Sequence, residues 1–134
     1  MKKIGTLNSS ISAVVADMGH MDTLAIADAG LPVPRETDKI DLALIKGVPG
    51  FLQTLETILS ELQVEEAIVA EEIQTEHPSS ILILEGIKRL MGDIPLTFVS
   101  HDNFKNLLPS CRAVVRTGEC TPYANIILCS GVTF

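Results

Sequence analysis

The sequence contains no tryptophan, one tyrosine and only 4% aromatic residues, and no apolar stretch in it approaches the ~18 residues of a membrane span. Basic residues are scarce as well: 10 Lys and Arg stand against 17 Asp and Glu, for a net charge of −7 at pH 7. A surface of this sign repels nucleic-acid phosphates and anionic lipid headgroups. The composition therefore argues against a nucleic-acid partner and against membrane insertion.

The three cysteines follow no metal-binding or disulfide pattern. Cys111, Cys120 and Cys129 are an odd number, each nine residues from the next, and no C-x-x-C pair occurs. This spacing favours free, buried or half-buried thiols in a reducing compartment over a zinc site or a disulfide framework. The first ten residues turn polar after two lysines and have no apolar core, so we expect no signal peptide there. These features predict a cytoplasmic protein.

Several well-known cofactor and catalytic motifs are missing. The sequence has no G-x-G-x-x-G after its first expected strand, no G-x-x-x-x-G-K-[ST], no G-x-S-x-G and no H-E-x-x-H. Dinucleotide, phosphate-loop, serine-hydrolase and zinc-protease functions therefore lose their usual support. Because there are only three histidines and no clustered cysteines, we expect no high-affinity transition-metal site.

The chain has the size of one domain, and nothing in it marks a boundary. Its 134 residues, 46% of them apolar, fall in the usual range for a domain, and no internal repeat or Gly/Ser linker divides them. We therefore treat residues 1–134 as a single domain. Hydrophobic periodicity predicts helices at 9–18, 49–62, 77–91 and 101–108, and strands at 23–28, 40–45, 66–70, 95–100, 113–116 and 125–129.

Strands that alternate with helices indicate an α/β fold. Residues 23–28 are apolar on both faces, which is typical of a parallel strand covered from both sides. We predict a mainly parallel sheet flanked by helices on both faces, layered like a Rossmann fold but without a dinucleotide fingerprint. Ligands of such sheets bind beyond the carboxyl ends of the strands, so we expect the ligand site at this edge.

Polar residues with useful chemistry stand at the ends of several of these elements. Asp28 closes the first strand, His101 follows a later one, and His20 follows the glycine after the first helix. Tyr123 and Asn125 stand at the start of the last strand. An α/β fold can gather such groups in one crevice, and histidine is the side chain best suited to exchange a proton near neutral pH.

Each of these residues also has a purely structural interpretation. His20 fits the end of a helix, where it gains from the helix dipole, and Asp28 can brace the loop that follows it. His101 can be an ordinary first-turn helix residue, Tyr123 a packing residue and Asn125 a turn former. Three further polar residues fit solvated surface groups, namely Glu71 and Glu72 at the end of a strand and His77 before a proline.

Two long motifs lie at opposite ends of the chain. The first is Gly-His-Met-Asp-Thr-Leu at 19–24, continued by Asp-Ala-Gly-Leu-Pro-Val-Pro at 28–34. The second is Arg-Thr-Gly-Glu-Cys-Thr-Pro-Tyr-Ala-Asn-Ile-Ile-Leu-Cys at 116–129, closed by Gly-Val-Thr-Phe. Together they resemble the D-ribose pyranase family, the RbsD-type sugar mutarotases. Shorter matches lie between them, at 46–49, 64–65 and 70–73, and the likeness weakens only over about 74–96.

The sister family, the L-fucose mutarotases, shares part of this pattern. It has the Gly-His-x-Asp start, the Asp-Ala step and a Tyr-x-Asn ending, but it typically differs in the loop after Asp-Ala and has no Cys-x-Pro before the tyrosine. Here Gly-Leu-Pro at 30–32 and Cys-Thr-Pro at 120–122 side with the ribose family. L-fucose mutarotase is therefore the alternative within the same group of enzymes.

The resemblance implies a role for each candidate residue. His20 would be the catalytic proton donor, and Asp28, His101 and the segment of Tyr123, Ala124 and Asn125 would bind the sugar. It implies an isomerase that opens and recloses D-ribose between its pyranose and furanose forms without cofactor or metal. It further implies a homo-oligomer, a decameric ring with sites near subunit boundaries, that serves ribose uptake and catabolism.

Two functions of other classes stay open at this point. A non-catalytic sugar-binding module would use the same pocket, and because ribose interconverts slowly unaided, the residues alone do not separate it from an enzyme. A nucleotide-binding α/β domain has only the fold in its favour, and the missing glycine-rich fingerprint counts against it.

Overall fold

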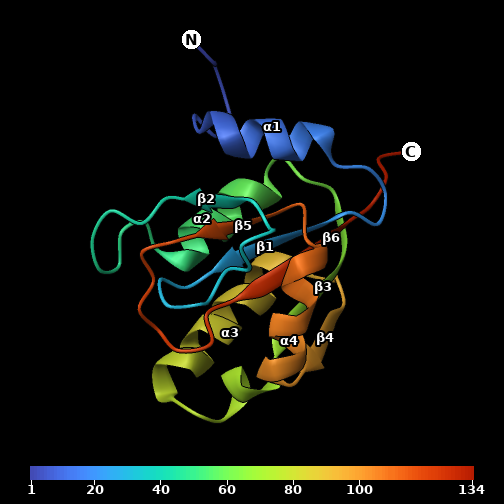
Figure 1. Ribbon diagram of the computed structural model, residues 1–134. Coiled ribbons are helices and arrows are strands. Elements are labelled where there is room, and N and C mark those ends of the chain that lie inside the picture. The colour runs from blue at the N-terminus through green and yellow to red at the C-terminus, as the bar shows by residue number, and fades with distance from the viewer.

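A computed structural model describes all 134 residues. Four α-helices, two short 3-10 helices and six strands follow one another along the chain (Figure 1). They are α1 (Ser9–Asp17), β1 (Thr23–Ala27), β2 (Lys39–Asp41), α2 (Phe51–Leu59), β3 (Val64–Ala70), η1 (Glu71–Gln74), α3 (Pro78–Met91), β4 (Leu96–Val99), α4 (His101–Leu107), η2 (Leu108–Ser110), β5 (Ala113–Arg116) and β6 (Ile126–Ser130).

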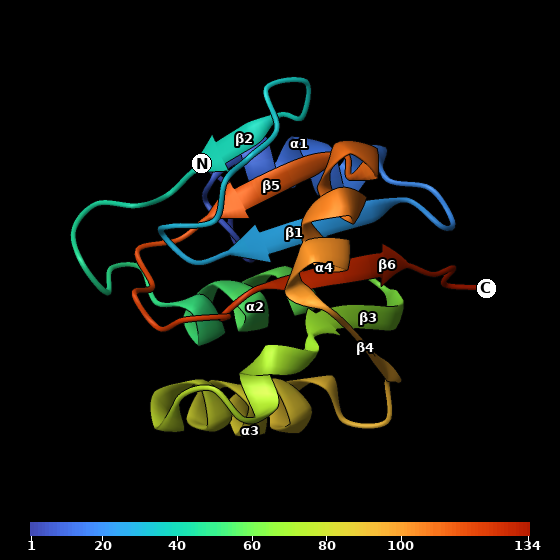
Figure 2. The same cartoon turned by 60° about the horizontal axis from the view of Figure 1, so that its bottom comes forward.

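The six strands form one sheet in the order β2-β5-β1-β6-β3-β4. β1 pairs in parallel with β5, β5 with β2, and β3 with β4, whereas β6 runs antiparallel to both of its neighbours, β1 and β3. Figure 2 shows the arrowhead of β6 pointing against that of β1. The predicted α/β fold with a mainly parallel sheet is confirmed.

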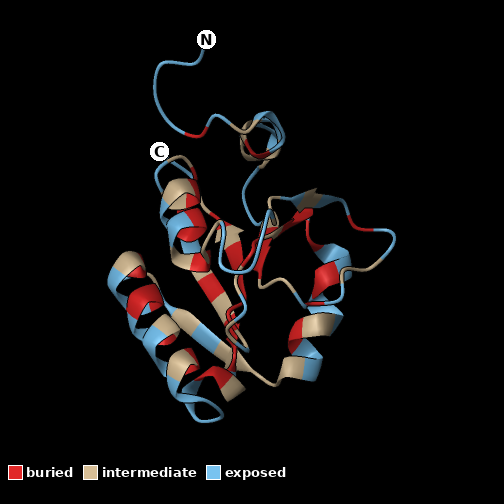
Figure 3. Ribbon diagram, turned by 90° about the vertical axis from the view of Figure 1, so that its left-hand side faces the viewer, coloured by how far each residue is buried: buried red, intermediate tan, exposed pale blue.

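Both faces of the sheet are covered, because successive residues of a strand point to opposite sides. In β1, Leu24 and Ile26 belong to a large core cluster with buried side chains of α1, α2 and α3, while Ala25 and Ala27 face a smaller cluster with Phe104 of α4. Figure 3 shows the buried strands lying between helices on the two sides. Residues 23–28 are apolar on both faces because β1 packs against a core cluster on each side of the sheet.

The helices begin where the sequence supplies a cap. Asn8 accepts the amide of Ile11 at the start of α1, and His77 accepts the amide of Ser79 ahead of Pro78 in α3. At such positions a side-chain acceptor replaces the missing partner of a first-turn N–H, and proline suits the first turn because it has no N–H to satisfy. None of the helices has the length and apolar character needed to cross a membrane.

One predicted strand is much shorter than expected. The segment 40–45 reads as a strand, but β2 ends at Asp41, and Leu44 and Ile45 are exposed in a turn closed by the Leu44 amide on the Val48 carbonyl. The physical reason is that β2 is an edge strand whose only neighbour is β5. Asp41 pairs with the last residue of β5, Arg116, so no ladder exists to extend β2 further.

Candidate functional site

The carboxyl ends of the parallel strands and the start of β6 meet at one edge of the sheet. Asp28 follows β1, His101 comes shortly after β4, and Tyr123, Ala124 and Asn125 lead into β6, which runs the opposite way. Five of the six predicted site residues therefore share this edge, called the carboxyl edge below. This is the region in which α/β sheets bind their ligands.

Asp28 and Asn125 form a reciprocal pair. The amide of Asp28 donates to Oδ1 of Asn125 at 2.8 Å, and Nδ2 of Asn125 donates to Oδ2 of Asp28 at 3.0 Å. The other carboxylate oxygen of Asp28 accepts the amide of Gly30 at 2.8 Å. Asn125 is 0% exposed, and both polar atoms of its side chain bond Asp28. The carboxylate of Asp28 is held in one orientation, and since each oxygen can accept a second bond, it is equipped to receive ligand hydroxyls.

A pocket of about 350 Å³ opens directly beside this pair. The loop after β1 and the loop before β6 form its wall, and the amide of Ala29 joins them by donating to the carbonyl of Glu119 at 2.8 Å. The volume lies at the lower end of the range of small-molecule pockets, roughly 300–1,000 Å³. Cys120 is exposed here, unlike the buried or half-buried thiol that the sequence predicts. The lining residues are Asp28, Ala29, Gly30, Glu119, Cys120, Thr121 and Pro122.

His101 and Tyr123 meet as rings at the same edge. Their centroids are 5.2 Å apart at an interplanar angle of 84°, an edge-to-face contact, and the rings of Phe104 and His101 are stacked with centroids 6.4 Å apart. Nδ1 of His101 is buried without a hydrogen-bond partner. Tyr123 has a φ of 62°, a left-handed conformation that costs a non-glycine residue on the order of 1 kcal/mol. Strain of this kind is concentrated at functional sites.

Arg116 braces the pocket loop from the end of β5. Its Nε donates to the carbonyl of Ala29 at 3.1 Å, and its Nη1 lies 3.1 Å from both carboxylate oxygens of Asp41. Partial burial pushes the pKa of Asp41 upward, but hydrogen bonds from Arg116 and the Ala43 amide, with the charges of Arg116 and Lys39, hold that pKa below its usual 3.8. The guanidinium thus links β2, β5 and the residue next to Asp28.

His20 lies elsewhere, at the opposite edge of the sheet. It occupies a turn, closed by the Asp22 amide on the Gly19 carbonyl at 3.2 Å, that precedes β1, whereas Asp28 follows β1. β1 is five residues long, which separates His20 and Asp28 by roughly 16 Å or more. Within one chain, the fold therefore does not place His20 in the same crevice as Asp28, and its role as the proton donor stays a prediction.

The surroundings of His20 also differ from its structural interpretation. α1 ends at Asp17 with Met18 as its cap, so His20 does not cap the helix. Its Nε2 lies 3.0 and 3.2 Å from the two carboxylate oxygens of Glu65, and 51% of its side chain is exposed. One carboxylate thus orients the imidazole, and the rest of the ring is accessible to solvent or to a neighbouring molecule.

Two glutamates of these sites were missed by sequence reasoning. Glu72 is not a solvated group, because both of its carboxylate oxygens accept the amide of His101, at 3.0 and 2.9 Å. Nothing in the sequence marks Glu65 as the partner of His20, since the two residues are 45 positions apart. Sequence position indicated a place at the carboxyl edge only for Glu72, which, like Asp28, comes shortly after a parallel strand.

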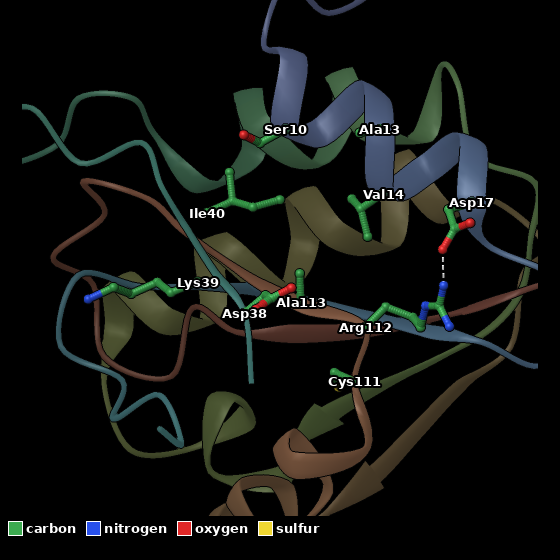
Figure 4. Close-up of a pocket in the computed structure, with 10 residues that line it drawn as sticks. All are labelled: Ser10, Ala13, Val14, Asp17, Asp38, Lys39, Ile40, Cys111, Arg112 and Ala113. Carbon is green, nitrogen blue, oxygen red and sulfur yellow. Dashed lines mark hydrogen bonds and ion pairs between the residues drawn. The ribbon is translucent and has the colours of Figure 1, made fainter. Parts of the chain in front are cut away.

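The largest pocket, about 910 Å³, lies between α1 and the β2–β5 edge and holds none of the predicted residues (Figure 4). Arg112 and Asp17 form an ion pair at its side, which Figure 4 draws as a dashed line. No group of three or more potential metal ligands occurs anywhere in the chain. The carboxyl edge remains the place where polar groups converge.

The fold and this edge define a small α/β protein in which polar side chains converge at the carboxyl ends of the parallel strands, beside a pocket of about 350 Å³. Residues 1–133 match the RbsD / FucU transport protein family, and the chain belongs to that family. The chain is 60% identical to a D-ribose pyranase of Clostridium perfringens (strain 13 / Type A) and 52% identical to one of Geobacillus thermodenitrificans (strain NG80-2). Both matches span 134 residues, all of this chain and 100% and 99% of the relatives. The family resemblance read from the two motifs is confirmed.

Solved structures agree with this assignment. The structure of Bacillus subtilis RbsD complexed with D-ribose matches with a TM-score of 0.95 and 45% identity over the full length of both chains. The fucose mutarotase of Streptococcus pneumoniae, solved in complex with L-fucose, matches at a TM-score of 0.81 but only 21% identity, over 96% of this chain and 95% of that one. The second likeness is one of fold alone.

Proposed function

We propose that this protein is a D-ribose pyranase, an isomerase that interconverts the pyranose and furanose forms of D-ribose. The observation that carries the proposal is the full-length identity of 52–60% to proteins named D-ribose pyranase. The ribose complex of Bacillus subtilis RbsD, similar over the whole chain, supports a ribose ligand. We place the reaction in the cytoplasm, in ribose catabolism, where a reducing environment suits three free thiols.

The reaction needs only proton transfer and positioning. Ring opening breaks the bond between the anomeric carbon and the ring oxygen, which gains a proton, while the anomeric hydroxyl loses its proton and becomes the aldehyde. Reclosure through a different hydroxyl reverses these transfers and yields the other ring size. Neither oxidation nor carbon–carbon cleavage occurs, so a positioned acid–base group, which typically contributes about 10²–10⁴-fold, suffices for the chemistry.

Proton transfer is assigned to His20 at one edge of the sheet, and positioning of the sugar to the residues at the carboxyl edge. His20, oriented through Nε2 by Glu65, keeps Nδ1 for proton exchange with the sugar. At the carboxyl edge, Asp28 receives sugar hydroxyls in the orientation that Asn125 imposes. His101 and Tyr123, with the backbone around Ala124, complete the sugar-binding surface.

Because one chain holds these parts at opposite edges, we assign them to neighbouring copies in a homo-oligomer, with His20 of one copy facing the pocket of another. Exposed apolar side chains beside the pocket support a partner there: Leu44 and Ile45 are 78% and 66% exposed. They line a second pocket, about 250 Å³, that shares Ala29 and Cys120 with the first. A decameric ring, as the family resemblance implies, provides such contacts for every copy.

Exchange NMR on ribose tests the activity. The wild-type protein is expected to accelerate pyranose–furanose exchange on the order of 10²-fold or more, His20→Ala to leave it at the uncatalysed rate, and His77→Ala, a change at an exposed histidine, to behave as wild type. The same measurement with L-fucose is expected to show little acceleration. Ribose binding by calorimetry with no change in exchange rate would instead support a sugar-binding module.

A further inference from the structure

Glu72 and His101 are brought together by the register of two neighbouring strands. β3 and β4 pair in parallel with Ala70 opposite Val99, and Glu72 and His101 each lie two residues beyond these partners. Both carboxylate oxygens of Glu72 accept the backbone amide of His101, at 3.0 and 2.9 Å. Hydrogen bonds to a carboxylate are about twice as strong as those between neutral groups. The contact therefore fixes the backbone of His101 relative to β3.

The ring of His101 depends on that backbone position. Its buried Nδ1 has no hydrogen-bond partner, so no polar contact at that atom sets the rotation of the ring. Two aromatic rings contact the imidazole, Tyr123 edge-on and Phe104 by stacking. Such contacts are individually weak and fall off quickly with distance. A small shift of the backbone would therefore move the imidazole out of its place beside Tyr123.

The start of α4 has a cap of its own that does not involve Glu72. Ser100 is the residue before the helix, and its hydroxyl accepts the amide of Asn103 at 3.2 Å. A serine at this position is the usual device for satisfying a first-turn amide. The contact from Glu72 is additional to this cap, and it acts on the backbone of the residue that carries the imidazole.

We propose that Glu72 is a positioning residue for sugar binding, acting through His101. This inference rests on the proposed function, in which His101 contacts ribose. Glu72 itself need not touch the sugar. Its carboxylate holds the amide of His101, which in turn keeps the imidazole against Tyr123 at the carboxyl edge. Loss of the contact is expected to weaken ribose binding while leaving the proton exchange at His20 intact.

Four variants test the proposal. Glu72→Ala removes the acceptor, Glu72→Asp keeps the charge but shortens the reach, and Glu72→Gln keeps the length and one acceptor oxygen. Ser100→Ala is the matched control, because it removes a contact from the same helix end without touching His101. In ribose exchange kinetics, the first two variants are expected to raise KM about tenfold with kcat within about twofold of wild type. Glu72→Gln and Ser100→Ala are expected to stay within about threefold of the wild-type KM.

Proton NMR of the three histidines provides a readout that does not depend on activity. The ring protons of His101 are shifted by the currents of the Tyr123 and Phe104 rings, and variants at each histidine identify its signals. In Glu72→Ala and Glu72→Asp, the His101 signals are expected to move toward those of the exposed His77, and in Ser100→Ala they are expected to stay. If Glu72→Ala does not fold, the comparison of Glu72→Asp with Glu72→Gln decides whether the carboxylate positions His101.

The proposal is overturned if the His101 signals stay in place in Glu72→Asp, or if that variant binds ribose as Ser100→Ala does. A wild-type protein that does not accelerate exchange would refute the proposed function separately. In that case the NMR comparison still decides whether Glu72 positions His101, and calorimetric titration with ribose replaces KM.

Discussion

Asp28 and Asn125 lie 97 residues apart in the sequence and hold each other by two hydrogen bonds, at 2.8 and 3.0 Å. The pair joins the end of β1 to the start of β6, its antiparallel neighbour. The buried amide of Asn125 thereby sets the direction of a carboxylate that borders the pocket. A rigid acceptor loses little conformational freedom when it binds a hydroxyl, which is how a small pocket gains affinity for a polar sugar.

Replacing Asn125 by alanine is expected to cost both stability and affinity. The change leaves the amide and one carboxylate oxygen of Asp28 without partners, which lowers the free energy of unfolding by about 2 kcal/mol. It also frees the carboxylate to rotate, so the dissociation constant for ribose is expected to rise at least about tenfold. Urea unfolding and calorimetry measure the two effects.

Asn8→Ala is the matched control for this experiment. It removes one side-chain hydrogen bond, to the amide of Ile11 at the start of α1, with a cost of about 1 kcal/mol. Ribose affinity is expected to stay unchanged in that variant. An Asn125→Ala protein that binds ribose as tightly as the Asn8→Ala protein would show that the pair does not orient Asp28 for the sugar.

Ribose is expected to protect Cys120 from alkylation. Cys120 is the exposed cysteine and lines the pocket beside Asp28, whereas Cys111 is buried. Burial raises the pKa of the Cys111 thiol, so that thiol is expected to react only after unfolding. Mass spectrometry after brief treatment with iodoacetamide is expected to show labelling at Cys120, slowed several-fold by saturating ribose.

Asp28→Ala provides the control for this protection, because a protein that no longer binds ribose leaves the labelling rate unchanged by the sugar. Equal labelling of wild-type Cys120 with and without ribose, under conditions where calorimetry shows binding, would place the sugar outside this pocket.

Asp41 is expected to contribute to stability at neutral pH and to lose that contribution in acid. Its pKa in the folded protein lies below 3.8, so the unfolded chain takes up the proton first as the pH falls. The stabilisation is present above pH 3.8 and disappears as the pH falls through the folded pKa. It is small, since 42% of the side chain is exposed.

The free energy of unfolding of wild type minus that of Asp41→Asn, measured in urea from pH 3 to 7, is expected to be constant near neutrality and to shrink below about pH 3.8. A difference that grows as the solution becomes more acidic would contradict the role assigned to Arg116 beside this carboxylate.

The sequence was informative about elements and about one edge of the sheet. Apolar residues on both faces of 23–28 predicted a strand covered from both sides, and β1 is such a strand. Asp28 and His101 are predicted to lie at one edge because each follows a parallel strand. The direction of the chain alone determines at which edge such residues lie. The order of the strands, by contrast, depends on packing between distant segments, and nothing local encodes the antiparallel placement of β6.

The place of His20 at the other edge of the sheet follows from the same reasoning about chain direction. A residue before a parallel strand and a residue after it lie at opposite edges, and His20 precedes β1 while Asp28 follows it. The contact between Glu65 and His20 could not be predicted, since one carboxylate among 17 acidic residues looks like any other until the strand register is known. The length of β2 likewise depended on β5, its only neighbour.

Mixed assemblies test most directly whether His20 of one copy serves the pocket of another. His20→Ala and Asp28→Ala chains, carrying different tags, are co-expressed and purified through both tags, and ribose exchange is measured by NMR. Each variant alone is expected to be inactive, whereas random mixing leaves about a quarter of the sites with both residues intact and restores about that share of the wild-type rate. Co-expression of His20→Ala with a chain that carries both substitutions is expected to restore nothing. Mixed assemblies of the two single variants that stay as inactive as either variant alone would contradict a site shared between copies.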